Sequence, residues 1–128
     1  MQIGGNDILQ KRDLKEVETE LREVITALSD NTDNVVMIST GNVGGASAFT
    51  GTDEAVEYET LTRQFRAMVM KVRDQTPLTY VDLFLEPNVD IISLNPEKYL
   101  AIDGLHPSSE GYGLWYAILK PTLDEVLK

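Results

Sequence analysis

The sequence contains no cysteine and only one histidine, His106, among its 128 residues. Without cysteine, neither a disulfide nor a thiolate-ligated metal can hold the fold together. Basic residues are also scarce, since 11 Lys and Arg stand against 21 Asp and Glu, and the formal net charge is −10. Binding to a nucleic-acid backbone or to anionic lipid needs clustered cations. We therefore expect no nucleic acid among the partners and no docking on an anionic membrane surface.

Long apolar runs are missing as well. No stretch reaches the roughly 18 consecutive apolar residues of a membrane-spanning helix. No segment combines a basic start with an apolar stretch in the manner of a signal peptide, and the sequence assigns no compartment. The remaining composition is globular, with 42% apolar and 25% charged residues. The length is that of one domain or part of one, and we predict a single domain over residues 1–128.

Apolar patterning predicts strands that alternate with helices. β-branched runs indicate strands buried on both faces, and apolar residues at helical spacing indicate amphipathic helices. In chain order the sequence predicts the end of a strand (1–3), a helix (13–28), a strand (35–38), a helix (53–75), a strand (78–84), a loop with one helical turn (86–100) and a last helix (108–127). This alternation predicts an α/β fold around a parallel sheet with right-handed crossovers.

Three loops are expected at the carboxyl edge of the sheet, where open parallel sheets bind ligands. They are Gly4–Asp7, Gly41–Gly51 and the segment that leads to Asp103–His106. The Gly-rich second loop lacks the lysine of a P-loop and the glycine spacing of a dinucleotide site, so phosphate binding is not expected. We predict that it forms a flexible part of a substrate pocket.

The first loop, Gly4-Gly5-Asn6-Asp7, has two interpretations. It can be a tight turn from a strand into a helix, because Gly and Asn tolerate positive φ. It can also present the side-chain amide of Asn6 as a donor to a developing oxyanion. Loss of such a donor typically costs ~10²–10³ in rate. These four residues do not decide between the two.

The third loop places Asp103 three residues before His106, with Gly104 between them. A compact turn can bring the carboxylate to imidazole Nδ1, which would fix the tautomer and leave Nε2 as a base. The alternatives are a surface histidine and a metal ligand. The metal is the weaker one, because one His and one Asp cannot complete a zinc site.

Together, GGND at residues 4–7 and DGLHPSSEGY at residues 103–112 resemble the SGNH/GDSL hydrolases, which are serine esterases and lipases. The resemblance implies a flavodoxin-like, three-layer α/β/α fold and hydrolysis of a small-molecule ester without metal or cofactor. It implies Asn6 as the oxyanion donor, His106 as the general base and Asp103 as the group that orients the base. We further predict that Gly5 and Asn42 contact the substrate.

The sequence departs from the family pattern at the nucleophile, because no Gly-Asp-Ser occurs in it. Ser39, Ser108 and Ser109 are not expected to substitute, since none follows a sharp strand-to-helix elbow. We expect a domain that lacks the family's first blocks and is inactive alone. Its exposed sheet edge would self-associate or accept a complementing segment. The alternatives are a non-catalytic binding domain of this family and a small α/β domain without pocket chemistry.

Overall fold

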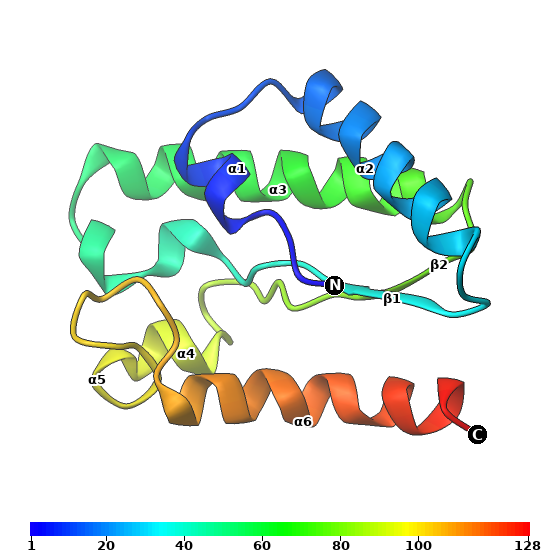
Figure 1. Cartoon of the computed structure of the whole chain (residues 1–128). Helices are drawn as coiled ribbons and strands as arrows, with labels where there is room; N and C mark the ends of the chain where they lie inside the picture. The colour runs from blue at the N-terminus through cyan, green and yellow to red at the C-terminus, as the bar shows by residue number, and fades with distance from the viewer.

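A computed structural model describes all 128 residues and places helices on both sides of a small parallel sheet (Figure 1). Strands β1 (Val35–Ile38) and β2 (Leu78–Val81) run parallel, with Val35 opposite Leu78. The segment Met1–Ile3 lies along the other side of β1 and joins it through a parallel bridge between Gln2 and Ile38. The spatial order is therefore Met1–Ile3, β1, β2, and the predicted α/β class with a parallel sheet is confirmed.

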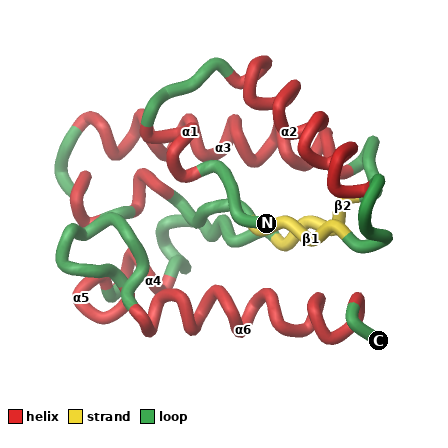
Figure 2. The backbone as a smooth tube through the Cα atoms, viewed as in Figure 1, coloured by secondary structure: helices red, strands yellow, loops and turns green.

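The three long helices lie where the sequence predicts them, with small differences at their ends, whereas a short helix after Met1–Ile3 and two 3-10 turns were not predicted (Figure 2). The bounds are α1 Gly5–Leu9, α2 Leu14–Ser29, α3 Asp53–Arg73, α4 Ile91–Leu94, α5 Pro96–Tyr99 and α6 Ser109–Val126, with two 3-10 turns, η1 Val43–Gly45 and η2 Ser47–Phe49. The segment 86–100 contains two short helices where one helical turn was predicted. No helix combines the length and the apolar character needed to cross a bilayer.

Local side-chain bonds explain several of these boundaries. The Asp13 carboxylate caps α2 by accepting from the N–H groups of Lys15 and Glu16. Ser108 caps α6, since its Oγ accepts from the Gly111 N–H at 3.1 Å. Strand β2 was predicted to reach Phe84 but ends at Val81. The Asp82 carboxylate accepts the Phe84 N–H at 3.1 Å, and this turn withdraws that group from a strand ladder.

Alternate residues of β1 face opposite sides of the sheet, as the period of two requires. Val35 and Met37 belong to the main apolar core, which α2 and α3 cover. Val36 and Ile38 pack on the other side, against a small cluster around Trp115 of α6. The main core also holds Ile8 of α1 and Phe65 of α3, so α1 is attached to α3.

Candidate active site

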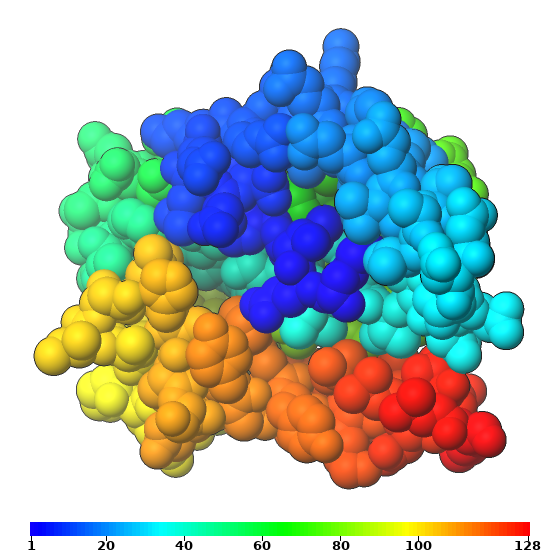
Figure 3. All heavy atoms as spheres, in the orientation of Figure 1, coloured from blue at the N-terminus to red at the C-terminus, as the bar shows by residue number.

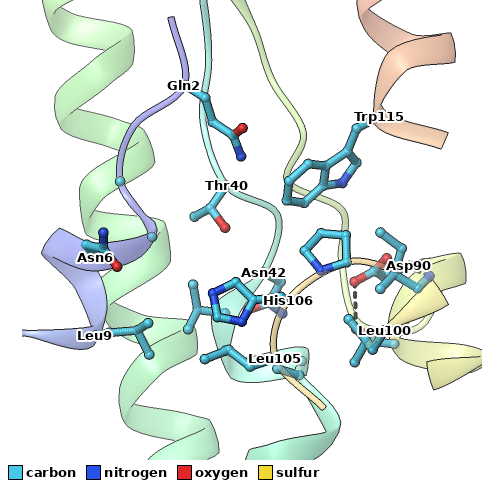
Figure 4. A pocket seen from close by; sticks show the side chains of 18 of the residues that line it. Gln2, Asn6, Leu9, Thr40, Asn42, Asp90, Leu100, Leu105, His106 and Trp115 are labelled. Atoms are coloured by element: carbon cyan, nitrogen blue, oxygen red, sulfur yellow. Dashed lines mark hydrogen bonds between the residues drawn. The ribbon is translucent and has the colours of Figure 1, made fainter. Parts of the chain in front are cut away.

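A cavity of about 440 Å³ opens beside the residues that follow Met1–Ile3 and β1 (Figure 4). Its walls come from the start of α1, from η1, from α4, from the turn before α6 and from α6 itself. Four of the five predicted site residues line it: Gly5, Asn6, Asn42 and His106. Asp103 does not line the cavity and instead contacts His106. The fold therefore brings the two motifs, about 100 residues apart in sequence, to one cavity.

The Gly4–Asp7 turn is built on the main core. Gly4 has φ 109°, in the region that favours glycine, and a Cβ on it would lie 2.6 Å from the Phe65 ring. Gly5 has neither constraint. Its φ is not positive, and the atom nearest to a Cβ on it would be Thr40 Oγ1 at 4.0 Å. Ile8, 3% exposed, anchors the short α1 in the core. The turn interpretation therefore applies to Gly4, and the same turn leaves Asn6 exposed at the cavity.

Asp103 and His106 form a hydrogen-bonded pair. Asp103 Oδ2 lies 2.6 Å from His106 Nδ1, and Asp103 Oδ1 accepts the N–H groups of Leu105 and His106, both at 3.0 Å. The bond from His106 and then these two backbone bonds lower the pKa of Asp103 to about 2. An ionised carboxylate can only accept, so Nδ1 must carry the proton. In the neutral ring, Nε2 then keeps its lone pair and can act as a base.

The Asp103–His106 turn is held against η2. Gly104, with φ 68°, accepts the Ala48 N–H at 3.0 Å, and a Cβ on it would lie 2.7 Å from Ser47 Oγ. At the base of the turn, the Ala101 N–H donates to the His106 carbonyl at 2.7 Å. Sequence reasoning missed the contact with η2. A glycine between the two motif residues was the available signal, but it did not show which segment approaches it.

Two glycines of the 41–51 loop, Gly44 and Gly45, lie at close contacts between segments. A Cβ on Gly44 would lie 2.2 Å from the Ala55 carbonyl oxygen of α3, and one on Gly45 would lie 2.3 Å from Ser93 Oγ of α4. Neither residue has positive φ. The loop was expected to be flexible because of these glycines. Its residues form η1 and η2, both of which contact α3, and Asn42, Val43, Gly45 and Ala46 line the cavity.

Ser39, Ser93 and Ser108 each form hydrogen bonds within the chain. Ser39 is 2% exposed and lies 2.7 Å from the Tyr80 hydroxyl, whose pKa burial raises to about 12. Ser108 caps α6. Ser93 is the one serine that lines the cavity, and its Oγ donates to Asp90 Oδ2 at 2.6 Å. Sequence reasoning singled out neither Ser93 nor Asp90, although Asp90 directly precedes a helical turn and so has the position of a cap.

The sequence profile of the GDSL-like lipase/acylhydrolase family matches residues 1–114. The chain belongs to this family. The match spans both the Gly4–Asp7 turn and the Asp103–His106 pair, the two elements that meet at the cavity. Comparison with curated proteins and with solved structures returns no match. Membership of this family suggests acyl-ester hydrolysis at the level of the family.

The carboxylates along the cavity wall outnumber the cations. Asp7, Asp90, His106 and Tyr112 are the titratable residues along its wall, and no Lys or Arg lines it. Arg12, which does not line the cavity, forms an ion pair with Asp7 at 3.0 Å and so offsets the charge of that carboxylate. A negatively charged ligand would meet Asp90 without a compensating cation. The cavity therefore favours neutral ligands over anionic ones.

Proposed function

We propose that this chain supplies the base and the oxyanion donor of a serine-type ester hydrolase. The observation that carries the proposal is the Asp103–His106 pair at 2.6 Å, with its imidazole in the same cavity as the Asn6 amide. The residues keep the roles that the family resemblance implies: His106 is the general base, Asp103 holds its tautomer, and Asn6 donates to the oxyanion.

The reaction begins when His106 Nε2 takes the proton of a serine hydroxyl while the serine oxygen attacks the ester carbon. The carbonyl oxygen becomes an oxyanion and accepts from Asn6 Nδ2. Collapse of this intermediate expels the alcohol, which receives its proton from Nε2. Water then gives a proton to the same nitrogen while its oxygen attacks the acyl carbon. The serine oxygen leaves and takes that proton back from Nε2, which releases the acid. Asp103 remains ionised throughout, because its low pKa keeps it an acceptor for Nδ1–H.

We also propose that the nucleophilic serine is not one of these 128 residues. Met1–Ile3 offers a place for the segment that carries it. In the parallel bridge, the Met1 carbonyl and the Ile3 N–H bond to Ile38, so the N–H and C=O of Gln2 point away from β1. Figure 3 shows these first residues at the surface, between α1 and α2 above and α6 below. A strand added there would extend the sheet of a three-layer, flavodoxin-like fold.

The test compares hydrolysis of 4-nitrophenyl acetate by this chain and by a fusion. The fusion places a strand and Gly-Asp-Ser block from another family member before Met1. We expect the chain alone to match its own His106→Ala variant, whereas the fusion hydrolyses the ester. In the fusion, His106→Ala should cost about 10³-fold or more, and Asn6→Ala about 10²–10³-fold.

Two outcomes would contradict the proposal. An active fusion that does not depend on His106 would remove the base from the mechanism. Hydrolysis by the chain alone that Ser93→Ala abolishes would place the nucleophile inside these residues, in the one cavity serine. Retention of an ester by a fusion that never hydrolyses it would favour the alternative, a binding domain. Sedimentation of the chain alone gives its oligomeric state. A monomer would leave the sheet edge at Met1–Ile3 unpaired, and a dimer would indicate that this edge pairs with a second copy.

A further inference from the structure

The cavity wall contains an amide without hydrogen bonds. Asn42 is 7% exposed, and both its Oδ1 and its Nδ2 are buried without a partner within the chain. Figure 4 shows Asn42 among the side chains that line the cavity. A buried polar group that lacks a partner costs roughly 1–3 kcal/mol. An apolar side chain of similar size would avoid that cost, so stability of the fold does not explain an amide at this position.

A second buried polar side chain lines the same wall. Asp90 is 6% exposed, and its two oxygens accept from the Ile92 N–H at 3.1 Å and from Ser93 Oγ at 2.6 Å. A carboxylate can accept about four hydrogen bonds, so acceptor capacity remains. No ion pair involves Asp90, and no Lys or Arg lines the cavity.

Gly45 joins these two groups into one patch. A Cβ on Gly45 would lie 2.3 Å from Ser93 Oγ and 3.5 Å from Asn42 Nδ2. Any larger residue would therefore push between the η1 side of the wall, which carries Asn42, and the α4 side, which carries Asp90 and Ser93. The absence of a side chain at this position keeps the amide and the carboxylate on a shared surface of the cavity.

We infer that Asn42 and Asp90 form a subsite for a hydroxyl-bearing part of the substrate. The hydrogen-bond donors and acceptors of these two side chains indicate which chemical group the subsite would bind. Asn42 offers one free acceptor and a free NH2 group, and Asp90 offers acceptors only. An ammonium group can donate but would leave Asn42 Nδ2 unpaired, and an anion would meet Asp90 unscreened. A hydroxyl donates and accepts at once, and a vicinal diol can satisfy both side chains together.

This inference rests on the proposed function, because it assumes that the ligand is the ester on which His106 acts. Asn6 and His106 would hold the reacting ester group, and the Asn42–Asp90 subsite would recognise a neighbouring hydroxylated portion. A site built to hydrogen-bond a hydroxyl discriminates strongly against the analogue that lacks it, since the site's own polar groups are then left unpaired. The subsite would thus select among esters without taking part in the chemistry.

The test uses three acetate esters with the whole chain: glycerol 1-acetate, which carries a vicinal diol, propyl acetate, which carries no hydroxyl, and acetylcholine, which is a cation. Binding is followed by NMR through the indole N–H resonance of Trp115, the only tryptophan, which lines the cavity, is retained in every variant and needs no turnover. We expect glycerol 1-acetate to bind at least about tenfold more tightly than propyl acetate or acetylcholine. Asn42→Leu should remove this preference, and Asp90→Asn should reduce it.

A stability readout separates this role from a structural one. If the amide is present for a ligand, Asn42→Leu should raise the unfolding midpoint while it abolishes the preference. Asn31→Leu is the matched control, because Asn31 is exposed at the end of α2, outside the cavity, and donates to the Ala27 carbonyl. It should keep the preference and gain no stability. Loss of stability in Asn42→Leu, with the preference kept, would overturn the inference.

The His106→Ala variant distinguishes the two proposals. The preference for glycerol 1-acetate should persist in it, because no hydrogen bond joins His106 to Asn42 or to Asp90. Equal binding of all three esters to the unaltered chain would overturn the subsite and leave the hydrolase proposal standing. A clear diol preference together with a fusion that is active without His106 would overturn the hydrolase proposal alone. If Asn42→Leu fails to fold, Asp90→Asn is the deciding variant. It should lower the affinity for glycerol 1-acetate relative to that for propyl acetate, and an unchanged ratio would overturn the subsite.

Discussion

The two sides of the candidate active site are held by different forces. The Asn6 side is built by packing, since Gly4 lies against the Phe65 ring and Ile8 fixes α1 in the main core. The His106 side is held by hydrogen bonds on an exposed turn, where the Asp103 and His106 side chains are 49% and 66% exposed. A base that must collect and release protons needs contact with substrate and water. A backbone turn that only orients a neutral donor, such as the Gly4–Asp7 turn, can itself pack against the core.

The largest expected effect is on the packed side. Phe65→Ala removes a ring that is 1% exposed, and we expect a loss of about 3–5 kcal/mol of unfolding free energy. Denaturant unfolding followed by tryptophan fluorescence measures it. Because the Asp103–His106 pair does not touch Phe65, Asp103 in the remaining folded protein should keep its low pKa. A shift of that pKa in the variant would show that the two sides are not separate.

Gly4→Ala tests the same side through the backbone. The positive φ and the overlap with Phe65 should together cost about 2–4 kcal/mol. Gly113→Ala is the matched control, because this glycine lies inside α6 with open space around its Cβ position. The control should leave stability unchanged or raise it by up to about 1 kcal/mol. Equal effects of the two substitutions would mean that Gly4 is not held by the core.

Gly104→Ala tests how the exposed turn is positioned. Gly104 and Gly51 both have positive φ, but only Gly104 would place a Cβ in contact, 2.7 Å from Ser47 Oγ. Each alanine should therefore cost about 1–2 kcal/mol from the backbone alone. Gly104→Ala should in addition displace the turn and shift the His106 imidazole resonances in NMR spectra. If Gly51→Ala shifts them equally, η2 does not position the turn.

The smallest effect is the titration of Asp103. His106→Ala removes the main cause of its low pKa, so the pKa should rise from about 2 toward 3.8, held somewhat below it by the two backbone bonds. A lowered carboxyl pKa stabilises the folded chain above about pH 3.8 and loses that contribution as pH falls toward 2. The pair is exposed, so the change in global stability should be slight. Carboxyl ¹³C resonances follow the titration, and an unchanged pKa would contradict the pairing.

Prediction from the sequence succeeded where local patterns carry the information. The helix at 13–28 was found because apolar spacing and the Asp13 cap lie within a few residues of one another, and β1 was found from a run of β-branched residues. It was less accurate at β2, where Asp82 ends the strand through a side-chain bond that the apolar pattern does not reveal. The glycines at 44 and 45 suggested flexibility, because sequence shows the missing side chain but not the neighbour that needs the space.

The sequence alone determined the family, since GGND and DGLHPSSEGY carry it, and it determined the order of helices and strands. It also indicated the Asp103–His106 contact, because a compact turn across a glycine can bring the two side chains together, but it left a surface histidine and a metal ligand as alternatives. Only the tertiary structure decided that Asn42, Asp90 and Ser93 share a wall with Asn6 and His106. These residues come from separate loops, and their meeting depends on how η1 and α4 pack around Gly45. Close packing of that kind is settled by the whole core at once, so no local stretch of the sequence records it.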